Sequence, residues 1–137
     1  MKPSAKDNLP KVLIVEDDVA TSSILNIWLR NKCHVFRACD GDEALEIIGD
    51  LHHSNQFINL FIFDISLPRP WTGITLKAEI INRWQIYQPS LFIAESAFAM
   101  PHDQELVLGA GFIAFFAKPL DRVKLLETVE QYLYQNL

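Results

Sequence analysis

The sequence has few cysteines, no long apolar run and no excess of positive charge. Its two cysteines, Cys33 and Cys39, show neither CxxC spacing nor a paired metal-ligand cluster, which is typical of a reducing cytosol. The apolar runs are much shorter than the roughly 20 residues of a membrane span, and residues 1–10 contain no secretory signal. Lysine and arginine total 12 against 17 for aspartate and glutamate, which gives a net charge of -5. We therefore expect a cytoplasmic protein with no membrane span and no direct contact with nucleic acid.

The composition is typical of one globular domain. The chain has 137 residues, of which 50% are hydrophobic and 21% charged, and a domain of this size buries roughly two thirds of its unfolded surface. No internal repeat, low-complexity segment or linker interrupts it. We expect residues 1–10 to form a flexible leader and residues 11–137 to form a single domain.

Hydrophobic patterning predicts strands that alternate with helices. Apolar or β-branched runs predict strands at residues 11–15, 34–38, 57–63, 91–94 and 112–117. Apolar stripes predict helices at residues 20–32, 74–87, 101–108 and 121–135, and one more between the Asp40 cap and the polar residues 52–56. In the last helix we expect the inward side chains to be Val123, Leu126, Val129 and Leu133.

The predicted strands lack the alternation of apolar and polar residues that is typical of a sheet with one solvent-exposed face. Continuous apolar strands are typical of a parallel sheet that helices cover on both faces. The sequence therefore predicts an α/β fold with a doubly wound, five-stranded parallel sheet. In such sheets ligands bind beyond the carboxyl ends of the strands, so the residues that follow each strand are the first candidates for function.

Chemically complementary side chains follow four of the five predicted strands. They are Glu16 and Asp17 after the first, Asp64 after the third, Ser96 after the fourth and Lys118 after the fifth. Taken singly, an acid at a strand end is more often a solvated loop residue and a serine more often a cap. Together, the carboxylates repel one another unless a cation compensates them, and Mg²⁺ prefers such oxygen ligands and often shares them with a phosphoryl group. The set predicts phosphoryl chemistry.

Over residues 11–136 the sequence resembles the receiver domain of two-component response regulators. The motifs that carry the resemblance are Val12-Leu-Ile-Val-Glu-Asp17, Ala38-x-Asp40-Gly41-x-Glu43-Ala44-Leu45, Phe61-Ile-Phe-Asp64 with Leu67-Pro68 and Gly73, Ser96-Ala97, and Gly111 before Lys118-Pro119. The resemblance implies a flavodoxin-like sheet with strand order 2-1-3-4-5.

The resemblance also implies a role for each residue that matches the family pattern. Asp64 is implied as the phosphoacceptor. Glu16, Asp17 and Asp64 are implied to hold Mg²⁺ together with the backbone carbonyl of Ser66. Ser96 and Lys118 are implied to contact the phosphoryl oxygens, and Ser96 and Phe115 to act as switch residues. Pro119 is implied as a structural residue that follows a peptide bond often cis in the family.

Two further positions bear on the lifetime of the phosphoryl group. Ser66 and Phe98 occupy places that in the family tune how readily water reaches the phosphoaspartate. We hypothesise that a bulky Phe98 slows self-dephosphorylation, while the alternative is that it packs against the adjacent helix. For Phe115, the alternative to a switch role is core packing. Trp28, on the helix that in the family often meets the phosphotransfer partner, is more often a core residue.

The implied function is a switch that takes a phosphoryl group from a sensor histidine kinase or a histidine phosphotransfer protein. It has no conventional external substrate and is expected to promote its own phosphorylation and dephosphorylation. The face formed by the fourth helix, fifth strand and fifth helix would then change its preference for a downstream protein. Because the last helix ends with the chain, we expect the output to lie in another protein or domain.

Two other classes of function remain open on the sequence. One is a receiver-like interaction module that is not phosphorylated, an alternative kept by the loop from Asp64 to Gly73, which is one residue longer than the common family pattern. The other is an enzyme on a similar sheet. Acids after the first strand disfavour a flavin phosphate, position 66 lacks the second aspartate of haloacid-dehalogenase-like phosphatases, and neither GxGxxG nor GxxxxGK[ST] is present.

Overall fold

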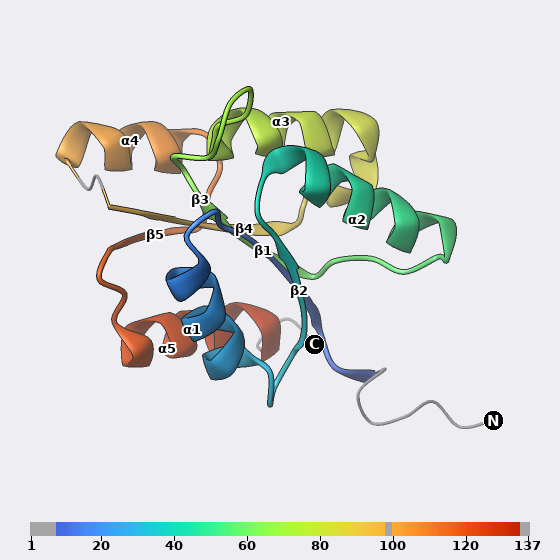
Figure 1. Cartoon of the computed structure of the whole chain (residues 1–137), viewed down its shortest axis with the longest axis horizontal. Helices are drawn as coiled ribbons and strands as arrows, with labels where there is room; N and C mark the ends of the chain where they lie inside the picture. The colour runs from blue at the N-terminus through green and yellow to red at the C-terminus, as the bar shows by residue number, and fades with distance from the viewer. Residues whose placement is uncertain (1–7, 98–99, 135–137) are drawn as a thin grey trace.

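One parallel sheet with helices on both faces forms the core of the protein (Figure 1). The computed structural model describes residues 8–97 and 100–134. The elements in chain order are β1 (Lys11–Val15), α1 (Val19–Leu29), β2 (His34–Ala38), α2 (Gly41–His53), β3 (Leu60–Asp64), α3 (Gly73–Arg83), the 3-10 helix η2 (Gln85–Tyr87), β4 (Leu91–Ser96), α4 (Pro101–Gly109), β5 (Ala114–Ala117) and α5 (Arg122–Tyr134). The strand order is β2-β1-β3-β4-β5, which confirms the predicted flavodoxin-like fold.

The two faces of the sheet carry separate apolar cores. Figure 1 shows α2, α3 and α4 on one face, and α1 and α5 on the other. Successive residues of a strand point to opposite faces, so Leu13 and Val15 pack with the first layer while Val12 and Ile14 pack with the second. Because both faces of the central strands β1 and β3 are buried, these strands carry apolar residues at successive positions, which explains the lack of alternation in their sequences.

Two aspartates cap helices at the carboxyl edge of the sheet. Asp18 accepts a hydrogen bond from the backbone N–H of Thr21 at the start of α1. Asp40 accepts one from the N–H of Glu43, 2.8 Å away, at the start of α2, as the sequence predicts. A side-chain oxygen at this position satisfies a donor that the helix leaves unpaired. Asp18 is therefore the N-cap of α1, and Glu16 and Asp17 are the acids of this segment that remain candidates for the functional site.

The prediction of one helix over residues 74–87 is wrong at its end. The α-helix stops after Arg83, and Trp84 adopts non-helical dihedral angles (φ -132°, ψ 90°) before the 3-10 turn η2. This break places Tyr87 in the core, with only 1% of its surface exposed. Its hydroxyl accepts a hydrogen bond from the N–H of Ile58, at 3.1 Å, and so satisfies a backbone donor that a continuous helix would leave buried and unpaired.

The prediction that Val123 faces the interior is also wrong, because this side chain is 63% exposed. The stripe of α5 that faces the sheet is instead centred on Leu125, Val129 and Leu133. These residues recur every four positions, whereas Val123 lies two positions before Leu125 and so points away from it. Within the described residues, no helix has the length and apolarity needed to cross a membrane. Most of the predicted leader, residues 1–7, lies outside the described part of the chain.

Candidate functional site

A lysine and three carboxylates meet where the strands end. Glu16 directly follows β1, Asp64 ends β3, Glu95 lies in β4, and Lys118 directly follows β5. Lys118 Nζ lies 2.5 Å from Glu16 Oε1, 3.3 Å from Asp64 Oδ2 and 3.7 Å from Glu95 Oε2. The structure therefore brings together three of the predicted site residues, Glu16, Asp64 and Lys118. We call Glu16, Asp64 and Glu95 the carboxylate triad.

The period of the strands explains why these side chains converge. Ile14, Ile62 and Ile93 all pack in the layer of α1 and α5. Each triad residue follows one of these isoleucines by two positions in the chain. Side chains two positions apart in a strand point to the same face of the sheet, so the triad side chains lie on the same face. Asp64 and Glu95 are moreover register partners on adjacent strands. One oxygen from each triad member lies within 4.8 Å of those of the others.

Glu95 is the residue that the sequence prediction missed. It is fully buried and follows four apolar residues in the strand Leu91–Ser96. A charged residue is almost never fully buried unless it is paired. The signal was present in the sequence, as an acid inside the run that precedes Ser96.

Burial and crowding shift the proton equilibria of the triad. Burial, aided by the neighbouring Asp64, raises the pKa of Glu16 to about 9, although Lys118 opposes the shift. Burial raises the pKa of Glu95 to about 7, again against the attraction of Lys118. Burial alone would lower the pKa of Lys118, but its hydrogen bond to Glu16 and the negative charges around it raise this pKa overall. Lys118 therefore remains an ammonium ion at neutral pH.

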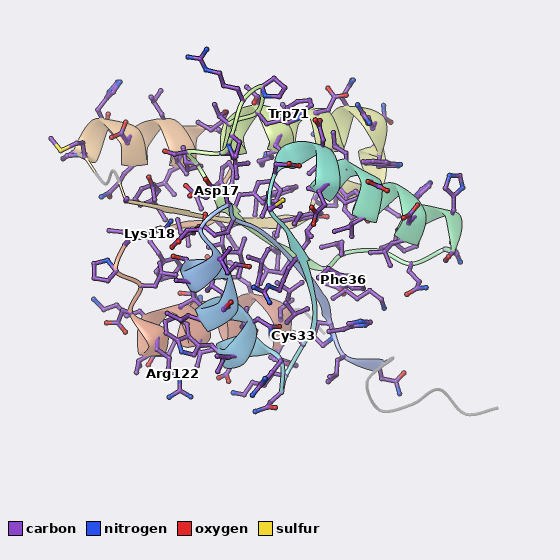
Figure 2. The ribbon with its side chains drawn as sticks, viewed as in Figure 1. Asp17, Cys33, Phe36, Trp71, Lys118 and Arg122 are labelled. Carbon is purple, nitrogen blue, oxygen red and sulfur yellow. The ribbon has the colours of Figure 1, made fainter. Side chains whose placement is uncertain are left out.

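Asp17 lies at the rim of the site. It is exposed and lines a pocket of about 220 Å³ together with Glu16, Arg37 and Glu43. Figure 2 shows Asp17 and Lys118 at the edge of the sheet where β1 and β5 end. Among the described residues, the closely spaced carboxylates are those of the triad, without Asp17. The predicted acidic pair thus divides into a buried member, Glu16, and an exposed member, Asp17.

Ser66, Ser96 and Phe115 line a second pocket, of about 90 Å³, on the side of α3 and α4. Ser96 is buried at the end of β4, and its carbonyl accepts a hydrogen bond from the N–H of Lys118, at 2.9 Å. The N–H of Ser66 donates to Asp64 Oδ1, at 2.8 Å. Phe115 is half-buried on β5. The backbone therefore connects both serines to Asp64 or Lys118.

Three further predictions concern Pro119, Phe98 and Trp28. The Lys118–Pro119 peptide bond is cis, as the resemblance implied. Phe98 lies outside the described residues. Trp28 is partly buried against the core between the sheet and α1 and also lines a pocket of about 190 Å³ with Ile24, Lys118 and Leu120.

The lengthened loop between β3 and α3 reaches across to α2. Trp71 lies against Gly41, the first residue of α2, and its Nε1–H donates to Asp42 Oδ1, at 2.8 Å. Figure 2 shows Trp71 in the loop beside α2 and α3. Trp71 therefore anchors the end of the loop that precedes α3 to the first turn of α2.

The triad has the chemistry of a magnesium site. Its donors are all carboxylate oxygens, the ligands that Mg²⁺ prefers. Three of these oxygens, Glu16 Oε2 and both oxygens of Glu95, are buried without a hydrogen-bond partner among the described residues. Buried unpaired carboxylates are unfavourable unless a cation compensates them. The residues present therefore fit a divalent cation.

Comparison with known families agrees with this geometry. A model of the response regulator receiver domain matches residues 12–130. The chain belongs to this family. The receiver domain is 28% identical over 117 residues to the osmosensing histidine protein kinase SLN1 of Saccharomyces cerevisiae, a match that covers 84% of this chain but only 9% of that kinase. It is also 28% identical over 123 residues to the polar-differentiation response regulator DivK of Brucella ovis, covering 89% of this chain and 94% of DivK.

Solved structures show the same fold. A CheY-like receiver domain from Methanospirillum hungatei superposes with a TM-score of 0.77 at 28% identity, over 93% of this chain and 96% of that one. The receiver domain of the histidine kinase PA1611 from Pseudomonas aeruginosa has a TM-score of 0.75 at 25% identity, over 90% and 97% of the chains, and holds a magnesium ion in its active site cleft. A co-crystal structure of the phosphotransfer protein Ypd1 with the receiver domain of Ssk1, from Saccharomyces cerevisiae, matches with a TM-score of 0.75 at 25% identity, over 90% and 88%.

Proposed function

We propose that this receiver domain accepts a phosphoryl group on Asp64 from a phosphohistidine and thereby switches a protein-binding face. The observation that carries the proposal is the position of Asp64 at the end of β3, with its Oδ2 atom 3.3 Å from the ammonium of Lys118. A carboxylate nucleophile needs a fixed positive charge beside the phosphoryl oxygens, because catalysis of phosphoryl transfer is mainly positioning and electrostatic stabilisation.

Each site residue has a role in this proposal. A carboxylate oxygen of Asp64 attacks the phosphorus atom while the bond from phosphorus to the donor nitrogen breaks, and the histidine leaves. Lys118 and the hydroxyl of Ser96 contact the phosphoryl oxygens. Glu16, Asp17, Asp64 and the carbonyl of Ser66 would hold Mg²⁺, which supplies charge neutralisation at the same oxygens. The magnesium ion in the PA1611 receiver domain supports this assignment.

The switch is a shift between two populations of one fold. Ser96 lies on the opposite face of β4 from Glu95, in the pocket that Phe115 also lines. A phosphoryl group on Asp64 would draw the Ser96 hydroxyl towards it, and Phe115 would follow into the vacated space. The surface of α4, β5 and α5 is the face that this movement changes, and an unidentified downstream protein would bind there.

The phosphoryl donor would approach the side of α1. Ile24 is 44% exposed there and, with Trp28 and Leu120, lines the pocket of about 190 Å³ that Lys118 borders. An apolar surface beside the reacting carboxylate suits a helix of a histidine phosphotransfer protein or kinase. The matching complex of Ypd1 with the Ssk1 receiver domain supports a partner of this kind. A cytoplasmic location would fit such partners.

The test is the intact mass of the protein after incubation with Mg²⁺ and acetyl phosphate, beside an Asp64→Asn variant. We expect a Mg²⁺-dependent gain of one phosphoryl group that the variant lacks. If folded protein shows no gain, titration with Mg²⁺ and beryllofluoride decides between two explanations. Binding would indicate a receiver that needs its own protein donor, and no binding would contradict the proposal in favour of an interaction module that is not phosphorylated.

A further inference from the structure

Glu95 is a buried negative charge that the proposed phosphoryl chemistry does not require. Its side chain is fully buried, and neither carboxylate oxygen has a hydrogen-bond partner among the described residues. Glu95 Oε2 faces Lys118 Nζ at 3.7 Å. The apolar residues Phe92, Ile93 and Ala94 precede it in the same strand.

The three acids differ in their distance from Lys118 Nζ. Glu16 holds the ammonium of Lys118 by a hydrogen bond of 2.5 Å, and Asp64 accepts a longer one of 3.3 Å. The contact with Glu95, at 3.7 Å, is an ion pair without a hydrogen bond. Glu95 therefore acts on the site through its charge, and this charge is weakly screened because no solvent reaches it.

When Glu95 is ionised, its negative charge has opposite effects on the two ligands that a receiver domain takes. It attracts a divalent cation that binds between Glu16 and Asp64. It repels the phosphoryl oxygens that bind beside Lys118, and it also partly neutralises the ammonium that those oxygens need. A purely structural side chain would change both affinities in the same direction.

We propose that Glu95 tunes the charge of the site, strengthening the binding of Mg²⁺ and weakening the binding of a phosphoryl group beside Lys118. Glu95 acts through its electrostatic effect on Lys118 and Asp64. The inference rests on the proposed function and adds to it a residue that sets the balance between metal and phosphoryl binding.

The experiment measures two dissociation constants by ¹H–¹⁵N NMR at pH 8 and constant ionic strength. The first titration uses MgCl₂ alone, and the second uses beryllofluoride, a phosphoryl mimic, at a Mg²⁺ concentration that saturates each protein. The variants are Glu95→Gln, which removes the charge at nearly constant shape, and Glu95→Asp, which keeps the charge. Glu46→Gln, on the exposed surface of α2, is the matched control for net charge.

We expect Glu95→Gln to bind Mg²⁺ about three- to tenfold more weakly and beryllofluoride several-fold more tightly, as removal of one nearby charge implies. Glu95→Asp keeps the negative charge, so its dissociation constants for Mg²⁺ and beryllofluoride should not shift in the way that those of Glu95→Gln do. Glu46→Gln should change neither constant by more than a factor of about 2. Losses of both affinities in Glu95→Gln, or no change in either, would overturn the inference.

The titrations of the wild type distinguish failure of the proposed function from failure of the inference, and one further measurement checks folding. If the wild type binds neither Mg²⁺ nor beryllofluoride, the proposed function fails, and the inference fails with it. If the wild type binds both and the two constants do not move in opposite directions, only the inference fails. The Tm in EDTA checks folding, and it should rise in Glu95→Gln and in Glu95→Met because each removes a buried charge that lacks a hydrogen bond.

Discussion

Lys118 is the residue on which the electrostatics of the site depend. Its single positive charge faces three carboxylates, and its side chain is only 19% exposed. In the absence of a metal ion, this arrangement is stable only if protons compensate part of the negative charge. The raised pKa values of Glu16 and Glu95 express that requirement.

Metal-free protein should therefore lose stability as the pH rises. The pKa of Glu16 rises from 4.5 to about 9 on folding and that of Glu95 from 4.5 to about 7. Between these values the folded state holds protons that the unfolded chain has released, so the free energy of unfolding falls with pH. The stabilisation is complete below pH 4.5 and is lost progressively up to about pH 9. We expect a loss of about 4 kcal/mol between pH 6 and pH 8.5, measured by urea unfolding in EDTA.

The control for this prediction is Glu16→Gln, which cannot ionise at position 16. Its unfolding free energy should depend less on pH over the same range, with the remaining dependence due mainly to Glu95. Cys33, whose pKa burial raises to about 11, contributes only above this range. A wild-type stability that is constant or increases from pH 6 to pH 8.5 would show that the triad is not protonated in the folded state.

Most residues of the candidate site could be identified from the sequence because they directly follow strands. Glu16, Asp64, Ser96 and Lys118 were chosen on that ground, and the structure places each of them at the predicted edge. Glu95 is not among the predicted site residues, although it directly follows the strand predicted at residues 91–94. The strand continues to Ser96, and Glu95 is fully buried within it. Its burial beside Lys118 depends on tertiary packing, which the local sequence pattern does not encode.

At the scale of elements, the loop between β3 and α3 is held by α2. The indole of Trp71 covers Gly41 and donates a hydrogen bond to Asp42 in the first turn of the helix. A Cβ atom at position 41 would lie 2.9 Å from Trp71 Cβ and closer still to Cγ and Cδ1. The helix must therefore begin with glycine for the loop to reach it.

We expect Gly41→Ala to destabilise the protein by about 2 kcal/mol, because overpacking of this kind displaces the neighbouring side chain. Gly49→Ala in the same helix is the matched control. A Cβ at position 49 would meet only Trp84 Cζ2, at an ordinary 3.8 Å, so the gain in helix propensity should stabilise the protein by up to about 1 kcal/mol. Urea unfolding measures both changes.

The indole N–H resonance of Trp71 gives a second readout. Its chemical shift should move in Gly41→Ala, because the hydrogen bond to Asp42 is lost or lengthened, and should stay in place in Gly49→Ala. Equal stabilities for the two variants would contradict the packing of Trp71 on α2. The sequence indicated only that this loop is one residue longer than usual, since the contact with α2 depends on a tertiary approach that no local pattern encodes.

At the scale of the whole molecule, the fold could be predicted because its sheet is buried on both faces. Continuous apolar strands at 11–15 and 91–94 and amphipathic helices between strands allow few arrangements. The two cores that result place α1 and α5 on one side and α2, α3 and α4 on the other (Figure 1). The end of α3 could not be predicted, because the break at Trp84 is set by the burial of Tyr87 and its hydrogen bond with Ile58.

Because the carboxylate triad is negatively charged, Mg²⁺ that binds there should increase the stability of the whole domain. A ligand that binds only the folded state stabilises it by about 2.7 kcal/mol at 100 times its dissociation constant. A metal ion must displace the protons that Glu16 and Glu95 hold, given their pKa values of about 9 and about 7. Its affinity should therefore increase with pH. We expect 10 mM MgCl₂, a chosen test concentration of roughly millimolar order, to raise the Tm more at pH 8.5 than at pH 6.

Matched sodium chloride is the control, because simple screening of the acidic surface also affects stability. It should reproduce little of the increase at pH 8.5, since the triad is buried and a monovalent salt does not replace the missing charge within it. The stability of the metal-free protein falls as the pH rises, whereas the stabilisation by Mg²⁺ increases. The stability of the Mg²⁺-saturated domain should therefore depend less on pH than the stability of the domain in EDTA. An equal increase in Tm at both pH values would mean that the metal ion does not compete with the protons of the triad and binds away from Glu16 and Asp64.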